Sequence, residues 1–197
     1  LCGYGMEAVL ALPFDKQLMT TPWADFLQSL VEDGAAGFVC GDDFRFGYRG
    51  EGNSEKLRAA CAAEGIPCVV VPQQMLDSQV VSSTYIRALL KDGKMAEAVR
   101  FLGHPYVLTG TVVHGKALGR KLGVPTANLR LPEGLAIPRF GVYACSCIID
   151  GKRYPAVTNL GVRPTVEGSG ITVEPWILDF EGDLYGRTIC VEFYKKL

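Results

Sequence analysis

Hydrophobic and polar positions follow two different patterns along this 197-residue chain, and the change falls near Gly103. Before it, three short apolar runs have the length and composition of buried strands: 7–14, 36–41 and 67–72. Four further segments carry apolar residues at helical spacing: 20–34, 53–65, 82–93 and 94–103. Strands that alternate with helices predict βαβ units and a parallel sheet.

The first of these helices has a clear start signal in its sequence. Thr21 is expected to be its N-cap and Pro22 its first helical residue, because proline is favoured at that position. Gly34 is expected to end it.

After Gly103 and Pro105 the helical spacing disappears. Five β-rich runs follow, separated by turns: 106–115, 141–150, 152–161, 172–180 and 187–197. Asp150-Gly151 predicts a hairpin, and Glu181-Gly182-Asp183 predicts a second one. Five or six strands in so short a stretch favour a small closed antiparallel barrel. We therefore expect an incomplete α/β domain at 1–102 and a six-stranded antiparallel β-barrel at 103–197.

The composition disfavours several classes of function but does not identify one. Twenty basic and twenty-one acidic residues leave a formal charge of −1, so no global field attracts nucleic acid. No apolar run approaches the ~20 residues that a membrane span needs. The seven cysteines include no C-x-x-C pair and only two histidines accompany them, which disfavours zinc and suits a reducing cytosol. We expect a cytoplasmic protein with small-molecule partners, and the sequence leaves its oligomeric state open.

Two motifs of the α/β half place polar residues where ligands bind. In CGDDFRFG, Asp43 follows a buried strand, and open α/β sheets bind ligands beyond the carboxyl ends of their strands. In VSSTYIR, Ser83 and Thr84 stand at a helix start that favours an anion, and Arg87 follows one turn later. The alternatives are a solvated loop over packed aromatics and an ordinary Ser/Thr N-cap beside a surface arginine. Together the motifs favour a nucleotide site.

The stretch GKALGRKLGVPTAN combines glycines and basic residues but does not match the P-loop pattern, since Lys121 precedes a leucine. Its glycines permit a sharp bend with exposed backbone N–H groups, and its basic side chains surround them, which favours a phosphate nest. We expect nucleotide phosphates to contact Gly115, Lys116, Gly119, Lys121 and Pro125. The alternative is a glycine-rich barrel loop with solvated lysines.

The end of the same stretch supplies oxygen ligands. Pro125 stiffens a turn that presents Thr126 and Asn128 on one side. A hydroxyl and an amide oxygen suit Mg²⁺ that is otherwise held by water and nucleotide phosphates.

Glu174, in TVEPWILDF, is the candidate proton acceptor. It alternates with Thr172 and Trp176 on one strand face, while Val173 and Pro175 take the other. A carboxylate beside a tryptophan in the mouth of a barrel could act as base towards a substrate hydroxyl. The alternative is a surface glutamate of a strand. Because Pro175 removes a ladder donor, an edge or bulge position is expected for it.

In this order the motifs CGDDFRFG, VSSTYIR, GKALGRKLGVPTAN, TNLGVRPT, TVEPWILDF and DLYG resemble the bacterial bifunctional riboflavin kinase/FAD synthetase family along nearly the whole chain. The resemblance implies a nucleotidyltransferase-like, Rossmann-type domain that adenylylates FMN to FAD. It also implies a barrel that phosphorylates riboflavin to FMN with Mg²⁺ and ATP.

The resemblance also assigns roles to single residues. Thr126 and Asn128 would serve the magnesium-ATP, and Glu174 would be the base on the ribityl hydroxyl. Flavin-binding residues are implied at Asn159, Arg163 and Trp176. Nucleotide binding in the α/β domain is implied for Asp43, Ser83, Thr84 and Arg87.

Two departures from the family pattern accompany the resemblance. The family's H-x-G-H-type loop has no counterpart, since the two histidines are His104 and His114. The family also continues beyond the last strand, whereas this chain stops at Leu197. We therefore expect a fragment that lacks both segments and does not adenylylate FMN by itself. A non-catalytic flavin or nucleotide sensor is the alternative function.

Overall fold

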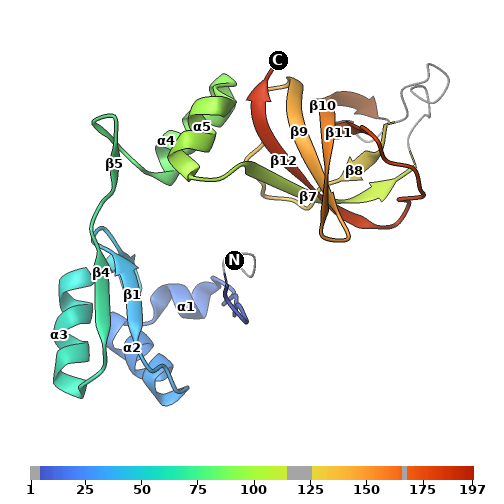
Figure 1. Cartoon of the computed structure of the whole chain (residues 1–197). Helices are drawn as coiled ribbons and strands as arrows, with labels where there is room; N and C mark the ends of the chain where they lie inside the picture. The colour runs from blue at the N-terminus through green and yellow to red at the C-terminus, as the bar shows by residue number, and fades with distance from the viewer. Residues whose placement is uncertain (1–4, 115–125, 166–167) are drawn as a thin grey trace. The chain divides into compact units, whose positions relative to one another are not determined.

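The computed structural model describes residues 5–114, 126–165 and 168–197, without the side chains of 163–165, 168 and 169. These residues form two compact units, Leu1–Gln74 and Met75–Leu197 (Figure 1). No helix among them is both long enough and apolar enough to span a membrane.

The first unit is built on two parallel strands, as the sequence predicts. Strand β1 (Phe38–Gly41) pairs with β4 (Cys68–Val71), and helix α3 (Ser54–Glu64) connects them. The Asn53 side chain caps α3 by accepting a hydrogen bond from the Lys56 N–H at 2.8 Å. The remaining elements of this unit are α1 (Lys16–Thr20), α2 (Trp23–Glu32), β2 (Arg45–Phe46), η2 (Tyr48–Gly50) and β3 (Gly52–Asn53).

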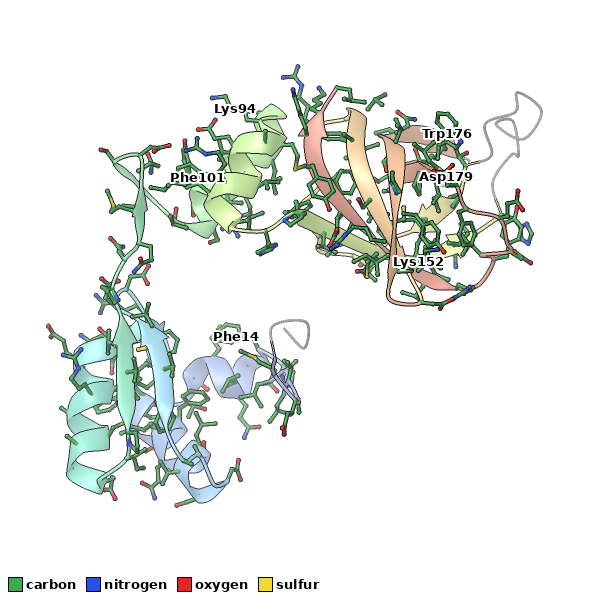
Figure 2. All side chains as sticks on the ribbon, viewed as in Figure 1. Phe14, Lys94, Phe101, Lys152, Trp176 and Asp179 are labelled. Carbon is green, nitrogen blue, oxygen red and sulfur yellow. The ribbon has the colours of Figure 1, made fainter. Side chains whose placement is uncertain are left out.

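Two sequence predictions for this unit are wrong. Residues 7–14 form no strand, and Leu10 and Phe14 are 84% and 79% exposed (Figure 2). A strand needs a partner for its backbone groups, and no described segment pairs with this one. Thr21 is not a helix N-cap, because it ends α1 and its hydroxyl donates to the Gln17 carbonyl; α2 has Pro22 at its N-cap.

The second unit contains the predicted closed barrel of six antiparallel strands. In chain order they are β7 (Tyr106–Val113), β8 (Asn128–Arg130), β9 (Gly141–Ile149), β10 (Lys152–Thr165), β11 (Gly168–Ile177) and β12 (Thr188–Lys196). Around the barrel the order is β10-β11-β8-β7-β12-β9. A short hairpin, β5 (Met75–Leu76) with β6 (Gln79–Val80), precedes helices α4 (Ser83–Asp92) and α5 (Met95–Leu102).

Of the two predicted hairpins, one is confirmed. Asp150 and Gly151 have φ angles of 52° and 76° and join β9 to β10, which is the backbone of a two-residue hairpin turn. Glu181-Gly182-Asp183 is not a hairpin, because β11 and β12 are not neighbours in the barrel. The turns between β11 and β12 fall at 178–179 and 185–186, and Gly182 is only a bend between them.

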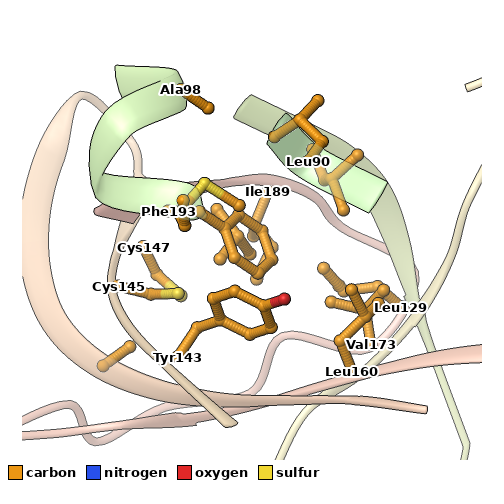
Figure 3. Packing of buried hydrophobic residues seen from close by; sticks show 14 of the residues in the cluster. Leu90, Ala98, Leu129, Tyr143, Cys145, Cys147, Leu160, Val173, Ile189 and Phe193 are labelled. Atoms are coloured by element: carbon orange, nitrogen blue, oxygen red, sulfur yellow. The ribbon is translucent and has the colours of Figure 1, made fainter. Parts of the chain in front are cut away.

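The barrel and the two helices share one apolar core. Side chains of alternate strand positions fill the interior, including the thiols of Cys145 and Cys147 (Figure 3). Their burial raises the pKa of each thiol to about 12, so both behave as small apolar groups. Leu90 of α4 and Ala98 of α5 belong to the same cluster (Figure 3).

Because α4 and α5 share the core of the barrel, the chain divides into compact units at a different point from the predicted domain boundary. The compact units separate between Gln74 and Met75, whereas the sequence analysis assigns α4 and α5 to a domain at 1–102. The helices lie with the barrel because their apolar faces are buried in its core. A functional boundary at 102/103 stays a prediction.

One carboxylate on the outside of the barrel is nevertheless buried. Glu192 is 7% exposed. Arg153 donates to it through two bonds, Nε to Oε2 at 2.8 Å and Nη2 to Oε1 at 3.0 Å, and the Tyr194 hydroxyl donates at 2.7 Å. The hydrogen bonds from Arg153 hold the pKa of Glu192 below its ordinary value, against the opposing effect of burial. A carboxyl with a depressed folded pKa stabilises the fold above its unfolded pKa, and this stabilisation disappears as the pH falls through the folded pKa.

We expect Glu192→Gln to lower the melting temperature of the barrel by roughly 5 °C at pH 7. The difference from the unchanged protein should shrink below about pH 4, where the glutamate itself becomes neutral. Thermal unfolding between pH 7 and pH 3 measures both effects. Glu133→Gln, at an exposed position, is the control, and a constant difference across this pH range would contradict the assignment.

Candidate active site

Strand β11 presents its polar side chains on the outer face of the barrel wall. Val173 and Pro175 are fully buried in the interior, so Glu174 and Trp176, at the alternate positions, face outwards. The predicted alternation is confirmed, but the sequence analysis placed Glu174 in the mouth of the barrel. The structure places Glu174 on the outside of the wall instead. The same strand carries Trp176, which Figure 2 labels.

The pairing of three strands brings the separate candidates together. Glu174 pairs with Asn159 of β10. Val173 pairs with Leu129 and Trp176 with Thr126, and this common register places Asn128 opposite Glu174. Side chains at directly opposed positions have Cβ atoms about 5 Å apart.

Glu174 therefore lies between two amide side chains, Asn128 on β8 and Asn159 on β10. Leu129 and Thr158 are buried, so their neighbours Asn128 and Asn159 take the outer face. Thr126, Asn128, Glu174 and Trp176 are half-buried, and Asn159 is exposed. The arrangement combines a carboxylate, neutral oxygen donors and an indole ring on one accessible surface.

Pro175 fits into this wall without weakening the β10–β11 ladder. Its carbonyl accepts a hydrogen bond from Ala127 N–H at 3.0 Å, just before β8 begins. In an antiparallel strand the N and C=O of one residue point to the same neighbour. The missing N–H of Pro175 therefore faces the segment before β8, where the ladder is already interrupted.

The donor set suits a magnesium ion better than a softer metal. Thr126 supplies a hydroxyl and Asn128 an amide oxygen, and Glu174 adds a carboxylate beside them. Mg²⁺ prefers such oxygen ligands and usually keeps waters and substrate phosphates as its remaining ligands.

Several predicted residues lie outside what the structure describes. These are Gly115, Lys116, Gly119, Lys121 and Pro125, together with the side chain of Arg163. The backbone of Arg163 belongs to β10 and pairs with Gly170.

The predicted nucleotide residues of the α/β half belong to two different units. Asp43 is exposed just beyond the carboxyl end of β1, in the first unit. Ser83, Thr84 and Arg87 are exposed on the first turns of α4, in the second unit. The Ser82 hydroxyl caps α4 by accepting from the Tyr85 N–H at 3.2 Å.

The sequence analysis missed a supporting role for Asp42. Its Oδ2 accepts from the Gln73 N–H at 3.1 Å, and its carbonyl accepts from the Ser54 hydroxyl at 2.8 Å. These bonds join the end of β1 to the segment after β4 and to the start of α3. The adjacent aspartates Asp42 and Asp43 were the signal in the sequence for this role. Successive side chains along a strand point in opposite directions, so only one of the two carboxylates could point to a ligand.

Two family models match the chain. Residues 102–197 match the riboflavin kinase model, and residues 1–85 match the FAD synthetase model. The two models together cover the barrel and most of the α/β segment. The chain belongs to the bifunctional riboflavin kinase/FAD synthetase family.

Similar proteins carry the same family name. A bifunctional riboflavin kinase/FMN adenylyltransferase from Pseudomonas fluorescens is 40% identical over 99% of this chain and 63% of its own length. The protein of that name from Escherichia coli K12 is 39% identical over 100% of the chain and 64% of its own length. The chain therefore spans less than two thirds of these relatives.

A solved structure is also similar. It is a crystal structure described as a macrolide-efflux protein from Streptococcus pneumoniae, with a TM-score of 0.78 and 31% identity. The match covers 93% of this chain and 60% of that one.

Proposed function

We propose that the barrel transfers the γ-phosphoryl group of ATP to riboflavin and so forms FMN. We further propose that the α/β part, in the whole protein, adenylylates FMN to FAD. The observation that supports the kinase most directly is the strand register, which aligns Asn128, Glu174 and Asn159 side by side on the outer wall. The relatives described above are named as enzymes with both activities.

Glu174 is the proposed base. Its carboxylate accepts the proton of the terminal ribityl hydroxyl as that oxygen attacks the phosphorus atom. Asn159, directly opposite on β10, donates an amide hydrogen bond to the flavin and orients it. Trp176 and Arg163 complete the proposed flavin contacts.

Thr126 and Asn128 are the proposed magnesium ligands. The ion, when bound with ATP, neutralises charge on the phosphates during transfer. The backbone bridge between Thr126 and Trp176 holds the threonine beside the strand that carries the base. The basic and glycine residues of 115–125 are proposed to bind the phosphates.

In the adenylylation reaction, exposed Ser83 and Thr84 at the start of α4 would bind nucleotide phosphates, and Arg87 would add a charge-assisted bond. Asp43, beyond the end of β1 in the first unit, is also a proposed nucleotide-binding residue. The six described cysteines are free thiols, which supports a reducing compartment such as the cytoplasm. A non-catalytic sensor would need neither a base nor a pair of metal ligands.

We expect Glu174→Gln to slow FMN formation by 10²–10⁴-fold, because the hydroxyl then loses its proton without a positioned base. Binding of ATP should be unchanged. Chromatographic assay of FMN from riboflavin and Mg-ATP measures the rate, with Glu181→Gln, at an exposed position between β11 and β12, as the control. A turnover number equal to that of the unchanged protein would assign Glu174 to structure alone.

Thr126→Ala should impair the binding of Mg-ATP and not the proton transfer to Glu174. The substitution removes one oxygen ligand but keeps the backbone bridge to Trp176, so we expect the KM for Mg-ATP to rise about 10-fold. The KM for riboflavin should change little, and higher Mg²⁺ should restore part of the rate. Thr188→Ala, an exposed threonine of β12, is the control. Equal effects on both KM values would argue against a metal ligand.

In the whole protein, Arg87→Ala should lower FAD formation from FMN and ATP by roughly 10- to 100-fold, the cost of one hydrogen bond to a charged phosphate. Formation of FMN should be unaffected, and α4 should persist because alanine favours helix. Arg58→Ala on α3 is a matched exposed control. If Arg87→Ala lowered neither rate, the nucleotide would have to bind elsewhere.

A further inference from the structure

The first unit contains a cavity that neither proposed reaction uses. It has a volume of about 280 Å³ and is lined by residues of both α2 and α3. Phe38, the first residue of β1, and Ile66, two residues before β4, also line it. The cavity therefore lies at the amino ends of the two parallel strands. Asp43, a proposed nucleotide-binding residue, follows the carboxyl end of β1 instead.

The wall of the cavity is mainly apolar, and the two helices contribute side chains of different size. Helix α2 contributes Leu27 and Val31, whereas α3 contributes Ala60 and Ala63. Alanine side chains are too short to fill the space between helices whose axes are typically about 8–10 Å apart. Atoms that line an empty apolar space lack contact partners on one side. A ligand with an apolar body would supply those contacts.

The polar groups of the wall favour a cation. Glu64, the last residue of α3, is the charged residue of the lining. Gln28 also lines the cavity, and its amide nitrogen donates to Glu32 at 3.0 Å, which leaves its carbonyl oxygen as an acceptor. Both helices end in a glutamate, and neither last turn, each fully described, contains a basic residue. The negative ends of two helix dipoles add to these carboxylates.

The start of α3 already carries a cation beside the cavity wall. The Lys56 ammonium donates to the Glu51 carbonyl at 2.7 Å, and it lies 5.5 Å from the ring centroid of Trp23, which lines the cavity. Charge therefore changes sign along α3, from Lys56 in its first turn to Glu64 at its end. A ligand that carries a positive group gains most when this group lies at the Glu64 end.

We propose that this cavity binds a small aromatic amine, with its ring between α2 and α3 and its ammonium group beside Glu64. The proposal is independent of the proposed kinase and adenylyltransferase reactions. The volume lies at the lower limit of small-molecule sites, about 300 Å³, which suits a single ring with a short aminoalkyl chain. The rings of Trp23 and Phe38 in the wall offer stacked or edge contacts to an aromatic ligand.

Three probes of similar size and different charge test the proposal: phenethylamine, phenethyl alcohol and hydrocinnamate. The chain has two tryptophans, Trp23 in the cavity wall and Trp176 in the barrel. Their indole N–H resonances in an NMR titration therefore report on the two units separately. We expect phenethylamine to shift the Trp23 resonance and not that of Trp176, with a Kd on the order of 1 mM. Phenethyl alcohol should bind roughly 3- to 5-fold more weakly, and hydrocinnamate should bind most weakly.

Two pairs of variants separate the shape of the site from its charge. Ala63→Leu fills the cavity and should weaken the binding of all probes at least about 10-fold. Ala62→Leu, at the preceding exposed position outside the lining, is its control, and leucine keeps the helix in both variants. Glu64→Gln should lower the affinity for phenethylamine to that for phenethyl alcohol. Glu55→Gln, exposed in the first turn of α3, should leave both affinities unchanged.

Three results would overturn the proposal. Absence of a Trp23 shift at ten times the expected Kd of phenethylamine would show that the cavity binds no such ligand. Equal affinities of the unchanged chain for the three probes would rule out selection of an amine. Equal binding by Ala63→Leu and Ala62→Leu would place the ligand outside the cavity.

Discussion

Closure of the barrel is the constraint on which the rest of the second unit depends. Six strands return on themselves, so every second side chain must enter one shared interior, where a polar group without a partner is costly. Val173 and Pro175 occupy such positions on β11. Glu174 is therefore held on the outside by its neighbours, and no loop has to position it.

The same constraint makes the wall an accurate support for chemistry. Asn128, Glu174 and Asn159 come from three strands, but the register fixes their order and spacing. The positions of side chains on strands are fixed more precisely than the positions of side chains on loops. The contact between buried Glu192 and exposed Arg153 links β12 to β10 across the outer surface. Rigid strands supply one side of the proposed site.

The sequence predicted what depends on local chemistry. The parallel sheet of the first unit, the turn at Asp150-Gly151 and the two faces of β11 all follow from residue type and periodicity. One of its errors, the N-cap at Thr21, is local, and the others concern partners distant along the chain. The segment 7–14 has the composition of a strand but no described partner, and the second hairpin failed because β11 and β12 are not adjacent. Register across β8, β10 and β11, which carries the outer-wall site, cannot be read from any single strand.

The burial of α4 in the barrel core has a consequence for the local unfolding of the second unit. Leu90 and Phe101 belong to the cluster formed by the strands, so the helices and the barrel should behave as one cooperative unit in amide hydrogen exchange. The amides of Leu89 and Leu90, which lie in that core, would then exchange only with the unfolding free energy of the barrel. The FAD synthetase match ends at residue 85, inside α4, so the segment that it covers ends in a helix that takes its stability from the barrel.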